Sequence, residues 1–226
     1  MAELRKSHTH HCNEGAGLDT IPHPMDAFET PWRDLIPFTP RSAPAPEISV
    51  RLQRQAGALS FQYALRAEMA HVRVPPAAPA DSNIPGASTR AAVQGGRSGR
   101  ADGLWNHTCF EAFIGGPGIP GYYEFNFSPS GQWAVYRFDS YRKGMSPAAV
   151  STPPHLTIRR SDVGLELKAT IRLHDLKVLQ SVRTLKLALS AVLEDDGGNL
   201  SYWALKHAPD KPDFHYPDGF VLELPL

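Results

Sequence analysis

The 226-residue chain has few cysteines, no long apolar run and no excess of charge of either sign. Its two cysteines, Cys12 and Cys109, lie in a predicted tail and inside a predicted strand, so no disulfide framework is expected. No apolar run approaches the length that a membrane span requires. Lysine plus arginine and aspartate plus glutamate number 23 each, and this balance argues against nucleic acid as the main partner.

The N-terminus also lacks the apolar segment of a secretory signal, because "MAELRKSHTHHCNEGAG" offers basic residues and no hydrophobic stretch after them. We therefore expect a cytoplasmic protein without a membrane partner. Residues 1–30 show no sustained period and are predicted to be a disordered leader, and translation starting at Met25 stays open beside Met1. The histidines of "HTHHC" (8–12) lack the spacing of a structural zinc site, so no metal site is predicted.

What is present from residue 31 onward is a period-two alternation of apolar and polar residues. In "EISVRLQRQ" (47–55) Ile48, Val50 and Leu52 fall on one face, and residues 57–69 and 163–173 alternate in the same way, while 185–194 and 199–205 form a hairpin around the turn "DDGG". Gly, Pro and Asp turns separate these runs, and "LHDLKVLQSV" leaves room for only one or two helical turns.

These features predict an all-β fold. We expect a single antiparallel β-sandwich, jelly-roll or immunoglobulin-like, with little helix, over residues 31–226. Residues 75–102 have few bulky apolar side chains and are predicted to be a mobile loop.

The segment "YYEFNFSPSGQWAVYRF" (122–138) predicts a hairpin around a Ser-Pro-Ser-Gly turn, in which Gly131 is able to take a positive φ. If the loop has an even number of residues, Asn126 lies opposite Trp133 and an odd loop breaks that register. On the even register one face carries Glu124, Asn126, Trp133, Val135 and Arg137, and the core face carries Tyr123, Phe125, Phe127, Ala134, Tyr136 and Phe138.

Two further segments carry candidate site residues. In "LWNHTCFEAFI" (104–114) Trp105 and Glu111 have the same parity, and pairing with the hairpin brings Glu111 and Glu124 into one polar patch. "SYWALKHAPDKPDFHYPDGF" (201–220) contributes Trp203 and His207 beside a loop dense in Pro, Asp and aromatic residues.

Each of these residue types has an ordinary interpretation and a functional one. Trp105 and Trp203 are either core aromatics or flat platforms on which a sugar ring stacks. Glu111 and Glu124 are either partners for arginines, with Arg137 and Arg142 available, or a general acid–base pair of the kind that glycoside hydrolysis requires.

The three strings around residues 101–114, 122–145 and 201–220 resemble bacterial DOMON-like domain proteins, which are related to family 9 carbohydrate-binding modules. The resemblance covers roughly residues 31–226 and implies a DOMON-type sandwich that binds a sugar or haem. In the sugar-binding relatives two tryptophans enclose the sugar and a glutamate follows the first by six residues, which implies roles for Trp105, Glu111 and Trp203 here. In the haem-binding relatives the ligands are a Met with a His or Lys, and Met145, Lys206 and His207 are the candidates.

From the residues and the resemblance together we predict a non-catalytic ligand-binding domain for a carbohydrate or a sugar-like metabolite, with no catalytic residue and no cofactor. The alternatives are a glycan-acting enzyme that uses the two glutamates and a b-type haem-binding domain. The oligomeric state is left open. The predicted ligand-binding residues are Trp105, Glu111, Glu124, Asn126, Trp203 and His207.

Overall fold

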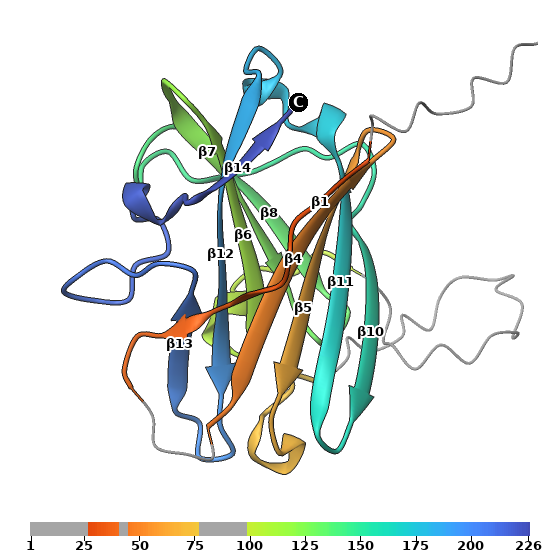
Figure 1. Cartoon of the computed structure of the whole chain (residues 1–226), viewed down its shortest axis with the longest axis vertical. Helices are drawn as coiled ribbons and strands as arrows, with labels where there is room; N and C mark the ends of the chain where they lie inside the picture. The colour runs from red at the N-terminus through yellow and green to blue at the C-terminus, as the bar shows by residue number, and fades with distance from the viewer. Residues whose placement is uncertain (1–26, 41–44, 77–98) are drawn as a thin grey trace, which may run out of the picture.

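The computed structural model describes residues 27–40, 45–76 and 99–226, and in them two antiparallel sheets pack face to face (Figure 1). Sheet A has the order β1-β4-β5-β11-β10, with β2 also paired to β4. Its strands are β1 (Phe28–Glu29), β2 (Arg33–Asp34), β4 (Glu47–Gln55), β5 (Ala58–Arg66), β10 (His155–Ser161) and β11 (Gly164–Arg172).

Sheet B has the order β3-β13-β12-β6-β7-β8-β9, and β14 pairs with β12. Its strands are β3 (Ile36–Pro37), β6 (Cys109–Gly116), β7 (Ile119–Phe127), β8 (Trp133–Phe138), β9 (Ser146–Pro147), β12 (Thr184–Glu194), β13 (Leu200–Ala204) and β14 (Leu222–Pro225). This architecture confirms the predicted all-β sandwich.

Helix is confined to short 3₁₀ turns in the described part of the chain, and none is long and apolar enough to cross a membrane. The two turns η4 and η5 fall in the segment where the sequence leaves room for them. The turns are η2 (Met69–His71), η3 (Leu104–Asn106), η4 (Leu173–Asp175), η5 (Lys177–Leu179) and η6 (Pro217–Gly219).

The predicted leader and mobile loop lie largely outside the described residues, which do not include 1–26 and 77–98, and those two predictions stand untested. The end of the predicted leader instead belongs to sheet A. Phe28 pairs with Arg54, and the backbone amide of Thr30 donates to the carbonyl of Leu52 at 3.0 Å.

The main core lies between the sheets and follows the alternation read from the sequence. Ile48, Val50 and Leu52 of β4 are each only 1% exposed. Facing them, a row across sheet B points inward, because directly paired residues of neighbouring strands share a face. That row is Trp203, Ala191, Phe110, Phe127 and Trp133.

The 122–138 hairpin corrects the register expected from an even loop. Ser128 and Gln132 close a three-residue loop with a 2.9 Å backbone hydrogen bond, and Gly131 takes a φ of 91°. Because the loop is odd, Phe127 pairs with Trp133. Trp133 and Val135 therefore point into the core, and the expected face assignment of β8 is wrong.

The corrected register brings Ala134, Tyr136 and Phe138 to the outer face of sheet B, on the side of Glu124. A second, smaller apolar cluster forms there, under the loops that cross this face. As a result nearly every residue of β6, β7 and β8 is buried, whichever way it points. The members of this outer cluster are Leu104, Cys109, Phe113, Tyr122, Ala134, Tyr136, Phe138 and Ala188.

Candidate functional site

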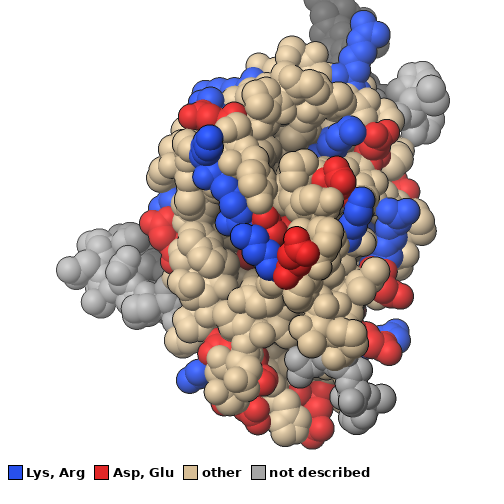
Figure 2. Space-filling model, turned by 90° about the vertical axis from the view of Figure 1, so that its left-hand side faces the viewer, with Lys and Arg blue, Asp and Glu red and all other residues tan. Residues whose placement is uncertain are grey.

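A pocket of about 400 Å³ opens on the outer face of sheet B, beside the outer apolar cluster. This volume falls within the roughly 300–1,000 Å³ typical of small-molecule sites. Figure 2 shows the side of the molecule on which the 205–216 loop lies in Figure 1. Acidic and basic side chains lie next to each other near the centre of this view. The lining residues are Trp105, Asn106, Glu111, Phe113, Glu124, Phe138, Arg142, Met145, Val192, Leu200, Tyr202, Pro212, Phe214 and His215.

Strand register places the two glutamates on the pocket floor. Glu111 of β6 pairs with Asn126 of β7, and Phe113 pairs with Glu124, so all four side chains leave the sheet on the same side. The polar patch expected from the sequence is therefore formed, and both carboxyl groups line the same pocket.

Glu111 is the least solvated acid of the pocket. It is 3% exposed, and its Oε1 atom has no hydrogen-bond partner among the described residues. Burial raises the pKa of the Glu111 carboxyl well above its usual value of 4.5, the neighbouring Glu124 adds to the rise, and Arg142 opposes it. Ser190, which pairs with Glu111 on the neighbouring strand β12, also has a buried hydroxyl without a hydrogen-bond partner among the described residues.

The carboxyl group of Glu124, unlike Oε1 of Glu111, has polar neighbours at both oxygens. Its Oε1 atom accepts a hydrogen bond from the Asn126 amide at 2.7 Å, and its Oε2 atom lies 3.7 Å from Nε2 of His215. Burial raises the pKa of Glu124, while the Asn126 amide and Arg142 act in the opposite direction. The pocket thus holds two neighbouring carboxyl groups that are easily kept protonated.

Arg142 reaches the pocket from a tight turn after β8 and is held there by Asp213. The Nε and Nη2 atoms of Arg142 donate to Oδ1 of Asp213 at 3.1 and 2.6 Å, and the Tyr141 hydroxyl bonds to Oδ2 of the same carboxylate. Burial alone would raise the pKa of Asp213, but its bonds from Arg142 and Tyr141 lower it. The backbone of Arg142 has a φ of 53°, a left-handed conformation that the hydrogen bonds of Arg142 and Tyr141 to Asp213 stabilise.

Aromatic side chains form the walls of the pocket. Trp105 packs edge-on against Tyr136, with their ring centroids 5.7 Å apart, and Tyr202 packs edge-on against Phe214 at 6.0 Å. Met145 and Leu200 add exposed apolar surface at the rim. Such flat apolar walls around polar groups suit a ligand with both ring faces and hydroxyls.

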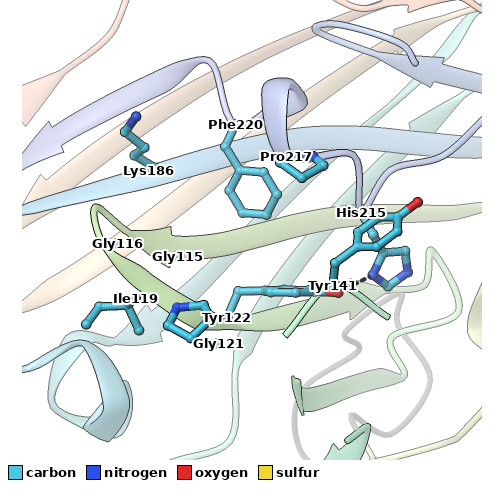
Figure 3. Close-up of a pocket in the computed structure, with 11 residues that line it drawn as sticks. Gly115, Gly116, Ile119, Gly121, Tyr122, Tyr141, Lys186, His215, Pro217 and Phe220 are labelled. Carbon is cyan, nitrogen blue, oxygen red and sulfur yellow. Dashed lines mark hydrogen bonds between the residues drawn. The ribbon is translucent and has the colours of Figure 1, made fainter. Parts of the chain in front are cut away.

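His215 separates this pocket from a smaller cavity of about 180 Å³ (Figure 3). The Tyr122 hydroxyl and Nδ1 of His215 are hydrogen-bonded at 2.7 Å, and the Arg142 amide donates to the same hydroxyl at 3.2 Å. Burial lowers the pKa of His215 to about 4, with Arg142 adding to the effect and Asp213 opposing it. At neutral pH the imidazole is therefore uncharged, with Nε2 directed to Glu124.

The predicted site residues divide into three groups. Trp105, Glu111 and Glu124 line the pocket, with Trp105 in η3 and not in a strand. Asn126 lies beneath the floor, is fully buried, and bonds to Glu124.

Trp203 and His207 lie elsewhere. Trp203 is 2% exposed and points into the core between the sheets, because it pairs with inward-facing Ala191. Nε2 of His207 is hydrogen-bonded to the carbonyl of Ile36 at 2.6 Å, and the side chain is outside the pocket lining. These two positions correct the expectation that all six residues surround one ligand.

Most lining residues are not among the ligand contacts predicted from the sequence, and Phe138, Arg142, Tyr202 and His215 are four of them. An even loop register places Phe138 on the core face, and the choice of Trp203 as a contact leaves Tyr202 on the opposite face of β13. The sequence indicates Arg142 only as a partner for the glutamates, and it indicates His215 as a histidine near the site that forms hydrogen bonds and does not bind a metal.

Of the three haem candidates, Lys206 and His207 are not among the residues that line the pocket. Met145 lies at the pocket rim, whereas His207 is bonded to the Ile36 carbonyl and is not among the lining residues. Within the residues that the structure describes, no group of three or more His, Cys, Asp or Glu side chains is placed to hold a metal ion.

Neither a scan of protein-family models nor a search of curated proteins finds a match to this chain. Among solved structures, the chain is similar to a protein from Bacteroides uniformis described as a candidate carbohydrate-binding protein, with a TM-score of 0.59 and 17% identity over 83% of each chain. It is also matched to a family 9 carbohydrate-binding module from Caldicellulosiruptor kristjanssonii in complex with cellotriose, with a TM-score of 0.45 and 8% identity over 84% of this chain and 76% of that one. At such identities the Bacteroides match supports the β-sandwich fold and nothing finer.

Proposed function

We propose that this protein binds a carbohydrate in the pocket on the outer face of sheet B. The observation that carries the proposal is the buried, unpartnered Oε1 atom of Glu111 at the floor of a pocket with aromatic walls. A buried acceptor without a donor is costly, and a ligand hydroxyl would supply the missing hydrogen bond. Trp105 and Tyr202 offer ring faces and edges against which a sugar ring would pack.

The names of the similar structures agree with this proposal without carrying it. The Bacteroides protein is described by carbohydrate binding, and the family 9 module was solved with cellotriose. We also propose that the chain is a DOMON-like protein, on the three sequence strings around residues 101–114, 122–145 and 201–220. A cytoplasmic location and the absence of catalysis stay predictions.

A titration followed by NMR tests the proposal. Glucose, galactose, mannose, cellobiose and cellotriose are added in turn to the uniformly ¹⁵N-labelled protein, and we expect saturable shifts of the Trp105 indole and of backbone amides around Glu111 and Glu124. The Trp32 indole, which lies on the outer face of sheet A, serves as the internal control and should not shift. Spectra unchanged by every sugar would contradict the proposal, and release of shorter sugars during the titration would favour the glycan-acting enzyme.

A further inference from the structure

The two carboxyl groups of the pocket have no cation of their own, because the nearby Arg142 is shared with Asp213. Arg142 is the one arginine or lysine among the lining residues, and its Nε and Nη2 atoms are already bonded to Asp213. Asp213 is 3% exposed and has a lowered pKa, so it is ionised and neutralises Arg142. What remains on the floor is Glu111 and Glu124.

His215 does not supply the missing charge. Its Nε2 atom lies 3.7 Å from Glu124, but burial holds its pKa at about 4, so the ring is neutral near neutral pH. Its Nδ1 atom is occupied by the Tyr122 hydroxyl. The remaining titratable groups near the pair on the outer face, Cys109, Tyr122 and Tyr136, are neutral when protonated and have raised pKa values, chiefly through burial.

The geometry of the pair fits a small cationic group. Glu111 Oε1 is an unpartnered acceptor that is more than nine-tenths buried, and Glu124 on the neighbouring strand lines the same pocket. Phe113 and Phe138 flank the floor, and the faces of aromatic rings attract a desolvated ammonium. An ammonium between the two acids would supply hydrogen-bond donors and a positive charge that is not shared with Asp213.

We propose that the pocket selects sugars carrying a free protonated amino group, such as hexosamines, over the corresponding neutral hexoses. This inference rests on the proposed carbohydrate-binding function and names its ligand class. Trp105 and Tyr202 hold the ring, while the ammonium lies between Glu111 and Glu124. N-acetylation removes the charge and enlarges the substituent, so N-acetylated sugars lose the preference.

The inference has a linkage consequence that a neutral ligand does not share. Burial favours the protonated forms of Glu111 and Glu124 in the free protein, and Glu124 adds to the effect at Glu111, so an ammonium bound between them promotes ionisation. Binding of a hexosamine therefore releases protons, and its affinity rises as the pH goes from acidic to neutral. The affinity of the parent hexose changes less over the same range.

The experiment is a paired calorimetric titration of the full chain. Glucosamine, galactosamine and mannosamine are each compared with the parent hexose and with the N-acetyl derivative, at acidic and at neutral pH and in two buffers of different ionisation enthalpy. We expect at least one hexosamine to bind about tenfold or more tightly than its parent at neutral pH, which corresponds to roughly 1.4 kcal/mol. The difference between buffers reports the released protons.

Two variants and a control localise the effect. Glu111→Gln and Glu124→Gln are expected to remove most of the hexosamine preference and the proton release, while the chain stays folded by circular dichroism. Glu166→Gln, on an exposed position of sheet A, should leave both unchanged.

The possible failures are distinguishable. If neutral hexoses bind and no amino counterpart binds more tightly, the inference is overturned and carbohydrate binding survives. If no sugar of either kind binds, the proposed function itself fails. A hexosamine preference that persists in both glutamine variants would also overturn the inference, because the charge recognition would then lie elsewhere.

Discussion

The outer faces of the two sheets have similar polar residue types but handle them in opposite ways. On sheet A the polar side chains bond to one another: Arg51 Nε donates to Gln62 at 2.9 Å, and Ser60 and Thr170 hydroxyls meet at 2.8 Å. On sheet B, Glu111 and Ser190 bury polar atoms that have no partner among the described residues. The polar side chains of sheet A already have hydrogen-bond partners within the protein, whereas the buried unpaired atoms of sheet B can still form hydrogen bonds with a ligand.

The cavities of the two faces also differ in how well their charged side chains are shielded from water. A larger hollow, about 890 Å³, lies on sheet A, but its charged side chains, such as Arg66, Arg159 and Glu166, are exposed to water. The pocket on sheet B is smaller and sits under loops that shield Glu111 and Glu124. Charged groups interact more strongly where water is excluded, so volume is a poorer guide to function here than burial.

Each outer face carries one partly exposed tryptophan, and the largest effect is expected from removing the one on sheet B. Comparing the two variants tests whether the two faces differ in function. Trp105→Ala should weaken binding of whichever sugar the titration identifies by roughly 30-fold, about 2 kcal/mol, since it removes a wall of the pocket. Trp32→Ala, on the outer face of sheet A, is the matched control and should leave the affinity unchanged. Isothermal calorimetry measures both, and an equal loss in the two variants would erase the functional distinction.

An intermediate effect concerns stability and its pH dependence. Burial raises the folded-state pKa of Glu111 above its usual 4.5, so its contribution to stability is full below that pH and is lost as pH rises toward the folded value. Glu111→Gln removes this loss, and the variant should exceed the wild type at neutral pH by at least about 1 kcal/mol in the free energy of unfolding.

Urea unfolding at several pH values measures that difference, and the gap between variant and wild type should close in acid. Glu166→Gln on the exposed face of sheet A should change stability by no more than about 0.5 kcal/mol. A Glu111→Gln variant that is less stable than the wild type at neutral pH would show that the carboxylate has a stabilising partner.

The smallest expected effect compares two serines of the outer faces. Ser60→Ala breaks its bond to Thr170 and should cost about 1 kcal/mol of stability, because the remaining hydroxyl loses its partner. Ser190→Ala removes a buried hydroxyl without a partner and should be neutral or slightly stabilising. Thermal and urea unfolding of the two variants give the comparison, and a larger loss for Ser190→Ala would mean that its hydroxyl is bonded in solution.

Much of the fold was predictable because alternation is a local property of a strand. The run 47–55 coincides with β4, and the pairing of "LWNHTCFEAFI" with the hairpin correctly brought Glu111 and Glu124 together. Trp105 reached the pocket for a different reason from the one expected, because η3 and not a strand carries it there.

The errors arose where one residue more or less in a loop decides the outcome. Because the loop closed by Ser128 and Gln132 has three residues, the side chain of Trp133 points into the core and those of Tyr136 and Phe138 lie on the outer face. The parity of β13 gave Trp203 one face and Tyr202 the other, but only pairing with β12 shows which of them points to the pocket.

By itself, then, the sequence determined that the chain forms strands, that these build a sandwich, and that two glutamates of neighbouring strands share a face. Tertiary structure alone decided what surrounds those glutamates. Arg142 and Asp213 are separated by 71 positions in the chain, yet their 2.6 Å contact sets the charge of the pocket. Alternation along a strand is fixed by local backbone geometry, whereas burial, charge pairing and the choice of face depend on contacts between segments that the sequence does not place beside each other.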